Sequence, residues 1–186
     1  MKAGDELSML RSFVEGWGDI AAGIGDDAAV LEIPAGEKLV VSTDAAVENV
    51  HFRRGDLSAE EIGYRAAAAA LSDLAAMASR PRGLLFALVL PVTWRDDARA
   101  LADGVGKAAR FAGCPVIGGN ISSGAELSIT TTVLGSSRSP LTRAGARVGD
   151  RVYVTGDLGS AADAVEAWKH GRIPTCLLYT SPSPRD

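Results

Sequence analysis

The sequence predicts an α/β (α+β) domain in which a mixed sheet carries helices on one face. Short apolar or alternating segments take turns along the chain with longer segments of helical periodicity. Hydrophobic residues make up 47% of the chain and charged residues 23%, as in a globular protein. With 186 residues the chain is long enough for one core of ordinary size.

Five segments have the composition of strands. Residues 38–43 are β-branched and apolar and lead into Asp44, and residues 83–90 are almost continuously apolar. A short strand is expected at residues 115–117. Residues 127–134 alternate Thr or Ser with apolar residues, which is typical of a half-buried strand. The last expected strand covers residues 151–155.

Three segments are expected to be helical. Ser58 and Glu61 form a capping-box pattern, which predicts a helix over residues 59–79. Thr93 and Asp96 suggest the cap of a second helix at 94–112, closed by Gly113. A third helix is expected at 160–170, after a structural turn at 156–159. Residues 118–124 are interpreted as a glycine-rich loop whose backbone could approach a bulky anionic ligand.

Three separate segments each place a carboxylate beside a small or hydroxylated residue: Gly25-Asp26-Asp27, Ser42-Thr43-Asp44 and Ser72-Asp73. Clustered carboxylates repel one another, so a fold that gathers them usually also gathers a cation. Oxygen ligands favour Mg²⁺ bound to substrate phosphates. We therefore expect Asp27, Asp44 and Asp73 to converge. The alternative is that each Asp caps a helix or lies in a solvated loop.

Asp73 lies on an otherwise apolar stripe of its helix, which it shares with Ile62, Ala66, Ala69 and Ala76. A carboxylate in that position needs a metal ion or a polar partner, for which a nearby arginine would suffice.

His51 and Arg143 have two interpretations each. A lone histidine is more often structural than functional, and Arg143 is either a phosphate contact or an ordinary exposed arginine.

Bulk properties exclude several classes of protein. The net charge of −4 gives no electrostatic footprint for nucleic acid, and no apolar run is long enough to cross a membrane. The N-terminal segment lacks a signal-peptide core, so a cytoplasmic location is expected. Cys114 and Cys176 form neither a disulfide framework nor a zinc site.

Six motifs occur in a specific order: GIGDDAAV at residues 23–30, VSTDA at 41–45, NVHF at 49–52, LSDLAAM at 71–77, GGNIS at 118–122 and LTRAG at 141–145. Together they resemble the thiamine-monophosphate kinases, of the superfamily that includes aminoimidazole ribonucleotide synthetase. The resemblance covers nearly all of residues 1–175.

The resemblance implies ATP-dependent phosphorylation of thiamine phosphate to thiamine diphosphate. It implies Mg²⁺ ions and the ligand set Asp27, Ser42, Thr43, Asp44, Asp73 and Asn120. It places His51 at the substrate, and Gly119, Asn120 and Arg143 at ATP. Many members have Asp in place of Asn120, and an amide oxygen binds Mg²⁺ more weakly. The resemblance also implies a homodimer whose sheets pair into a barrel. No catalytic side chain is expected, because the nucleophile is a phosphate oxygen with a second pKa of about 6.

The domain organisation follows from the same resemblance. We expect an ATP- and Mg²⁺-binding dimerisation domain at residues 1–155 and the start of a linker or second domain at 156–175. Residues 176–186 resemble a translated sequencing adapter, so we expect them to be non-native and the native gene to continue past about residue 175. The chain would then be incomplete for catalysis. The alternatives are a related ATP-dependent synthetase acting on an amide or carbamoyl group, and a non-catalytic dimerisation domain.

Overall fold

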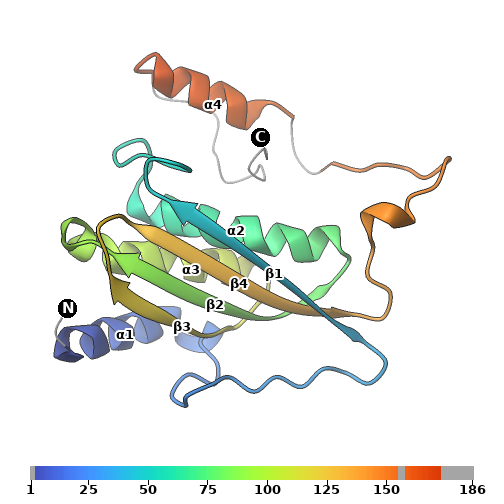
Figure 1. Cartoon of the computed structure of the whole chain (residues 1–186), viewed down its shortest axis with the longest axis horizontal. Coiled ribbons are helices and arrows are strands. Elements are labelled where there is room, and N and C mark those ends of the chain that lie inside the picture. Colours follow the sequence, from blue (N-terminus) through green and yellow to red (C-terminus); the bar gives the residue numbers. More distant parts are fainter. Residues whose placement is uncertain (1–2, 155–157, 173–186) are drawn as a thin grey trace. The chain divides into compact units, whose positions relative to one another are not determined.

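A four-stranded mixed sheet forms the centre of the first of two compact units, Met1–Leu141 and Thr142–Asp186. The structure is a computed structural model that describes residues 3–154 and 158–172. The strands are β1 (Lys38–Val47), β2 (Arg80–Leu90), β3 (Val116–Ser123) and β4 (Ser128–Ser137), in the order β1-β4-β2-β3 (Figure 1). β4 is antiparallel to β1 and β2, and β2 is parallel to β3. The expected mixed α/β fold is confirmed.

Two helices, α2 (Ala59–Ala76) and α3 (Ala98–Phe111), cover one face of this sheet, as expected (Figure 1). The predicted capping box is present: Ser58 Oγ accepts from the Glu61 N–H, and the Glu61 carboxylate accepts from the Ser58 N–H. Leu84, Phe86 and Leu88 of β2 are buried on the covered side. We call this side the helix face and the opposite side the open face.

Glycines bring α2 and α3 into backbone contact. A Cβ atom at Gly63 would lie 2.0 Å from the Leu101 carbonyl oxygen, and one at Gly104 would lie 1.9 Å from the Glu60 carbonyl oxygen. Only residues without a side chain allow this approach. The two helices therefore form one closely packed layer above the sheet.

The first helix, α1 (Ala3–Trp17), is an element that the sequence analysis did not identify; a short 3-10 turn, η1 (Gly18–Ile20), follows it. Its buried Phe13 and Trp17 pack with Phe86 of β2, with ring centroids 5.9–6.3 Å apart. Trp17 Nε1 donates a hydrogen bond of 2.7 Å to the Ala102 carbonyl. Aromatic packing and this bond attach α1 to the core.

The expected helix at 94–112 begins differently. Residues Val92–Asp97 form a 3-10 helix, η2, and α3 starts at Ala98 with Asp97 at its N-cap. The predicted cap at Thr93 and Asp96 is therefore wrong. The buried Trp94, whose N–H donates to the Pro91 carbonyl, belongs to this tighter turn. Gly113, with φ of +61°, closes the helix as expected.

Two strand predictions also need correction. β3 runs from Val116 to Ser123, so the expected loop at 118–124 is mostly strand, because β2 offers a parallel partner along this length. Residues 151–154 form no strand. They are exposed, and an apolar, β-branched segment becomes a strand only where another strand pairs with it. Thr155 lies outside the described residues.

The second unit contains the 3-10 turn η3 (Arg143–Gly145) and the helix α4 (Ser160–Lys169), which confirms the helix expected at 160–170. The expected turn at 156–159 is described only at Leu158 and Gly159, and residues 176–186 lie outside the description. In the part of the chain that is described, no helix has the length and apolarity needed to span a bilayer.

Candidate functional site

Packing of α2 on β1 brings Ser42 and Asp73 into direct contact. Ser42 Oγ donates a hydrogen bond of 2.5 Å to Asp73 Oδ2. Side chains alternate along a strand, so Asp44 shares the helix face of β1 with Ser42. All three residues are half-buried. Two of the three acidic segments therefore meet here, and the partner that Asp73 needs on its apolar stripe is a hydroxyl group.

Thr43 lies on the open face of β1, opposite Ser42. Its hydroxyl is 2.9 Å from the Thr132 hydroxyl of β4, and the two residues are paired in the strand register. Thr132 in turn lines a pocket on this face. The three consecutive residues Ser42, Thr43 and Asp44 are thus divided between the two faces of the sheet.

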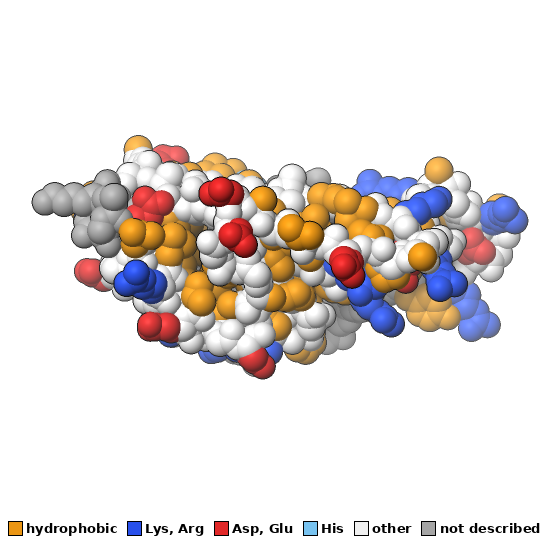
Figure 2. Space-filling model, turned by 90° about the horizontal axis from the view of Figure 1, so that it is seen from below, with side chains coloured by type: hydrophobic (Ala, Val, Ile, Leu, Met, Phe, Trp, Pro, Cys, Tyr) orange, Lys and Arg blue, Asp and Glu red, His pale blue; other side chains and the backbone are white. Residues whose placement is uncertain are grey.

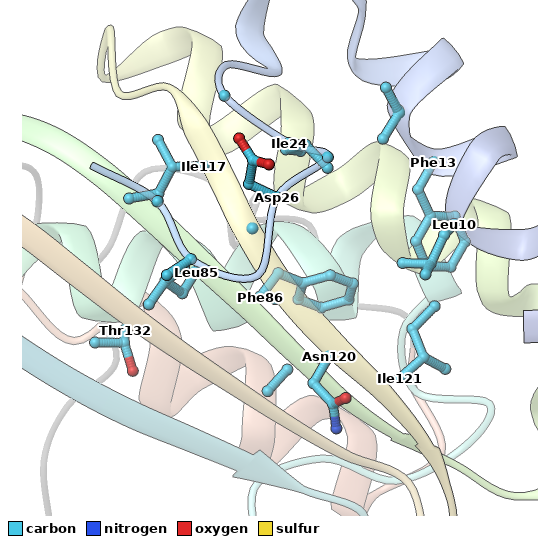
Figure 3. Close-up of a pocket in the computed structure, with 18 of the residues that line it drawn as sticks. Leu10, Phe13, Ile24, Asp26, Leu85, Phe86, Ile117, Asn120, Ile121 and Thr132 are labelled. Carbon is cyan, nitrogen blue, oxygen red and sulfur yellow. The ribbon is translucent and has the colours of Figure 1, made fainter. Parts of the chain in front are cut away.

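This pocket has a volume of about 870 Å³ and lies mainly on the open face, although Phe86 of the helix face also lines it. α1, residues 23–31 and strands β2, β3 and β4 all contribute to its lining, which is mostly apolar. Figure 3 shows Asp26 and Asn120 on either side of Phe86 in that view, with Leu10 and Phe13 from α1 nearby. Hydrophobic side chains also reach the surface on the side of the molecule seen in Figure 2. Asp26, Asp27 and Asn120 provide the carboxylate and amide groups of this mostly apolar hollow, and Thr130 and Thr132 provide hydroxyl groups.

Asp27 does not converge with Asp44 and Asp73. It is exposed and lines the open-face pocket, whereas Asp73 binds Ser42 on the helix face. No three His, Cys, Asp or Glu side chains form a possible metal-binding group within residues 3–154 and 158–172. This structure does not bring Asp27 to the other two carboxylates, and the assignment of Asp27 to the metal site stays a prediction.

Gly119 and Asn120 lie inside β3 rather than in a loop. A Cβ atom at Gly119 would be 1.8 Å from the Phe86 carbonyl oxygen of β2. This glycine thus allows two strands to approach each other. It is also exposed at the pocket, and its assignment to ATP stays a prediction. Asn120 is exposed at the pocket, in register with Ala87.

His51 lies in the turn that follows β1 and is exposed. Its ring Nδ1 accepts a hydrogen bond of 3.1 Å from the Val47 N–H. Asn49, with φ of +63°, adopts the left-handed conformation that asparagine tolerates in such turns. Arg143 lies in η3 of the second unit and is exposed. The assignments of His51 to the substrate and of Arg143 to ATP stay predictions.

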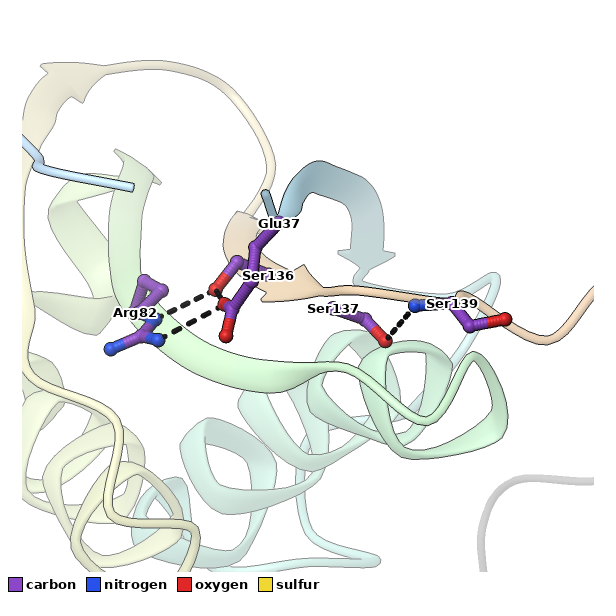
Figure 4. Close-up of polar contacts among 5 residues, drawn as sticks. All are labelled: Glu37, Arg82, Ser136, Ser137 and Ser139. Carbon is purple, nitrogen blue, oxygen red and sulfur yellow. Dashed lines mark hydrogen bonds and ion pairs between the residues drawn. The ribbon is translucent and has the colours of Figure 1, made fainter. Parts of the chain in front are cut away.

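One polar cluster was not found by sequence reasoning. Glu37, Arg82 and Ser136 interact at the end of the segment that leads into β1 (Figure 4). Ser136 Oγ donates a hydrogen bond of 2.5 Å to the Glu37 carboxylate, and Arg82 Nη2 lies 3.2 Å from the same oxygen. The Ser136 hydrogen bond is the main cause of the lowered pKa of Glu37. No local signal marks these residues, because up to 99 positions separate them.

The chain matches known proteins over most of its length. The family model described as AIR synthase related protein, N-terminal domain, matches residues 25–137. A thiamine-monophosphate kinase of Synechococcus elongatus is 40% identical over 141 residues, which cover 73% of this chain and 42% of that protein. The corresponding Bacillus subtilis protein is 37% identical, covering 85% and 51%. The chain spans about half the length of these curated relatives.

Solved structures show the same likeness. The thiamine-monophosphate kinase of Stenotrophomonas maltophilia K279a has a TM-score of 0.76 and 34% identity, covering 100% of this chain and 62% of that one. AaThiL complexed with AMPPCP and TMP has a TM-score of 0.70 and 30% identity, covering 89% and 52%. A hydrogenase maturation protein HypE complexed with ATP has a TM-score of 0.63 and 24% identity, covering 86% and 48%, and thus shares only the fold.

Proposed function

The chain belongs to the family of AIR synthase related proteins, whose N-terminal domain it contains, and on this basis we propose that the whole protein is an ATP-dependent kinase of thiamine phosphate. The product is thiamine diphosphate. The observation that carries this proposal is the 29–40% identity to thiamine-monophosphate kinases, compared with 19–24% to the HypE structures. The neighbour that was solved with AMPPCP and TMP adds support for a nucleotide and a phosphate acceptor as the two substrates.

Mg²⁺ fits the oxygen donors of the helix face. Ser42 and Asp73 are already in contact, and Asp44 shares their face of β1. Hydroxyl and carboxylate oxygens suit this hard cation. When bound, Mg²⁺ would neutralise charge between the two phosphate-bearing substrates. Asp27, Thr43 and Asn120, the remaining predicted ligands, lie toward the open face in this structure. We propose Ser42, Asp44 and Asp73 as the nucleus of the metal site.

The protein's own side chains position the substrates rather than supply a base. The acceptor is a phosphate oxygen that is largely ionised at neutral pH, with a second pKa of about 6. Catalysis therefore consists of alignment and relief of the repulsion between two polyanions. This explains a candidate site rich in aspartate and poor in lysine and cysteine. Gly119, Asn120 and Arg143 are proposed to contribute to ATP binding, and His51 to substrate binding.

We further propose a homodimer formed through the sheet, with the two copies pairing into a barrel. β1 and β3 are the edge strands of the sheet, and the open face of β1 exposes the apolar side chains of Leu39 and Val41. Sedimentation should give twice the monomer mass. The double variant Leu39→Glu, Val41→Glu should give the monomer mass, and a monomeric parent chain would disprove the dimer.

The activity test is ATP-dependent formation of thiamine diphosphate. We expect turnover by a whole protein with the length of its relatives and none of significance by the 186-residue chain, which spans about half that length. Asp44→Ala in the whole protein should abolish turnover. Strong turnover by the 186-residue chain that is lost in its own Asp44→Ala variant would show that the second half is dispensable.

Two alternatives to the kinase are a non-catalytic dimerisation domain and a related ATP-dependent synthetase. Titration calorimetry tests the first, because a chain that binds Mg²⁺–ATP is not an inert dimerisation domain. A related synthetase would consume ATP with an amide or carbamoyl substrate, and the whole protein would then leave thiamine phosphate unchanged.

A further inference from the structure

The turn that follows β1 is anchored to the buried indole of Trp94. Trp94 lies in η2 and is 3% exposed. Phe52 meets its ring edge-on, with centroids 6.4 Å apart, and the Arg54 guanidinium lies 4.4 Å above it. Arg54 also donates to the Thr93 carbonyl and pairs with Asp97. The turn that carries His51 is thus held from its C-terminal side.

Glu48 holds the same turn from its N-terminal side. Its Oε2 accepts a hydrogen bond of 2.9 Å from Trp94 Nε1 and one of 3.5 Å from the Leu127 N–H. The Glu48 N–H in turn donates to the Leu127 carbonyl at 2.9 Å. A single carboxylate therefore connects the end of β1 to η2 and to the residue preceding β4.

Two hydrogen bonds to Val47 fix the orientation of the His51 ring within this turn. The His51 N–H donates to the Val47 carbonyl at 2.9 Å, and the Val47 N–H donates to His51 Nδ1 at 3.1 Å. An Nδ1 that accepts from a backbone N–H carries no proton, so the proton of the neutral ring is on Nε2. The side chain is exposed, which leaves Nε2–H free to donate.

We infer that Glu48 and Trp94 are positioning residues that hold His51 as the Nε2–H tautomer, a neutral donor to a phosphate oxygen of the acceptor substrate. This inference rests on the proposed function for the identity of the acceptor. Donation from a neutral ring lets His51 orient a phosphate group without accepting its proton. The role fits a reaction whose nucleophile is already ionised.

The tautomer can be observed directly by ¹⁵N NMR of the imidazole rings in the 186-residue chain, at about pH 8.5, above the ordinary titration range of histidine. The chain has two histidines, so assignment needs only one substitution. We expect an unprotonated Nδ1 and a protonated Nε2 for His51. His170, whose Nδ1 is 2.9 Å from the Glu166 carbonyl, should show the opposite tautomer. A protonated Nδ1 in His51, or an average of both tautomers, would overturn the inference.

Three variants test the positioning. Trp94→Phe keeps the ring contact with Phe52 but removes the indole N–H, and Glu48→Ala removes the carboxylate. Both should convert the His51 signals to a tautomer average. Glu126→Ala, which removes an exposed carboxylate from the same β3–β4 connection, should leave them unchanged. If neither Trp94→Phe nor Glu48→Ala changes the tautomer, the positioning role is disproved.

Titration of the chain with each ligand shows whether His51 contacts the phosphate of the acceptor or that of the nucleotide. Thiamine phosphate with Mg²⁺ should shift the His51 Nε2 signal and leave His170 unchanged. No shift, or a shift with AMPPCP alone, would overturn the assignment to the acceptor. A shift with thiamine phosphate, combined with no thiamine diphosphate formed by the whole protein, would keep this inference and overturn the proposed function.

Discussion

Ser42 on β1 and Asp73 on α2, which are 31 positions apart in the sequence, meet through a hydrogen bond of 2.5 Å. The bond joins the two layers of the domain at the residues proposed to bind Mg²⁺. It also satisfies a carboxylate that would otherwise lie on the apolar side of a helix. The site is therefore partly assembled before a ligand arrives.

Asp73→Asn should weaken binding of Mg²⁺–ATP to the chain by about tenfold or more, equivalent to about 1.4 kcal/mol. The change removes the negative charge but keeps a group that can bond to Ser42. Titration calorimetry in the presence of Mg²⁺ measures the affinity. Asp96→Asn, at an exposed position of η2, is the matched control and should bind like the parent. Equal affinities for both variants would remove Asp73 from the metal site.

Gly119→Ala should destabilise the fold by about 1–3 kcal/mol even without nucleotide, because the new methyl group overlaps the Phe86 carbonyl. Urea denaturation measures the free energy of unfolding. Gly145→Ala is the control, since its Cβ would meet only the Thr142 hydroxyl at 3.4 Å. A Gly119→Ala chain of unchanged stability but reduced ATP affinity would instead favour a role of this glycine in ligand binding.

Glu37 should make stability depend on pH. Its pKa in the folded chain is lowered from 4.5, chiefly by the Ser136 hydroxyl and also by Arg82. A lowered folded-state pKa contributes stability above the unfolded value, and this contribution is lost as the pH falls through the folded pKa. The stability difference between the parent and Glu37→Gln should therefore be largest near about pH 7 and shrink in acid.

Urea midpoints measured across this pH range test the Glu37 prediction. Glu32→Gln, an exposed carboxylate earlier in the same segment, controls for the loss of one charge. A constant difference between the parent and Glu37→Gln down to strongly acidic pH would contradict the prediction.

Cys114 should be almost inert to alkylation in the folded chain. Burial raises the pKa of its thiol from 9.0 to about 12, so at pH 8 the thiolate fraction falls by about 10³-fold. In a Cys176→Ser chain, iodoacetamide should label Cys114 slowly in buffer and rapidly in urea. Comparable rates in both conditions would show that the thiol is accessible.

Local signals predicted much of the fold. The strands at β1, β2 and β4 and the helix α2 were found because alternation, β-branched residues and the Ser58–Glu61 box act within a few residues. The start of α3 was misplaced because Trp94 is drawn into the core by contacts with Phe52 and Glu48, more than 40 positions earlier. β3 was cut short because its glycines read as a turn until β2 is placed beside them.

The candidate site was predictable in its chemistry and less so in its geometry. The shared face of Ser42 and Asp44 follows from strand alternation. The hydrogen bond from Ser42 to Asp73 depends on how α2 packs on β1, and the sequence analysis expected a metal ion or an arginine there. The placement of Asp27 on the open face is not predictable either, because no regular element carries that residue. The Glu37–Arg82–Ser136 cluster and the Glu48–Trp94 bond depend on contacts between distant segments, which periodicity does not encode.

The two glycine contacts between α2 and α3 also limit how this chain can vary. Since Gly63 and Gly104 each face a backbone carbonyl at 2.0 Å or less from an added Cβ, the smallest side chain forces the helices apart. α2 also carries Asp73, so the helix contact and the proposed metal site share one element. A library that randomises both helices and is selected only for folding should retain glycine at these two positions, while exposed neighbours such as Lys107 accept many residues. Mutational tolerance would thus map the helix contact without reference to any activity.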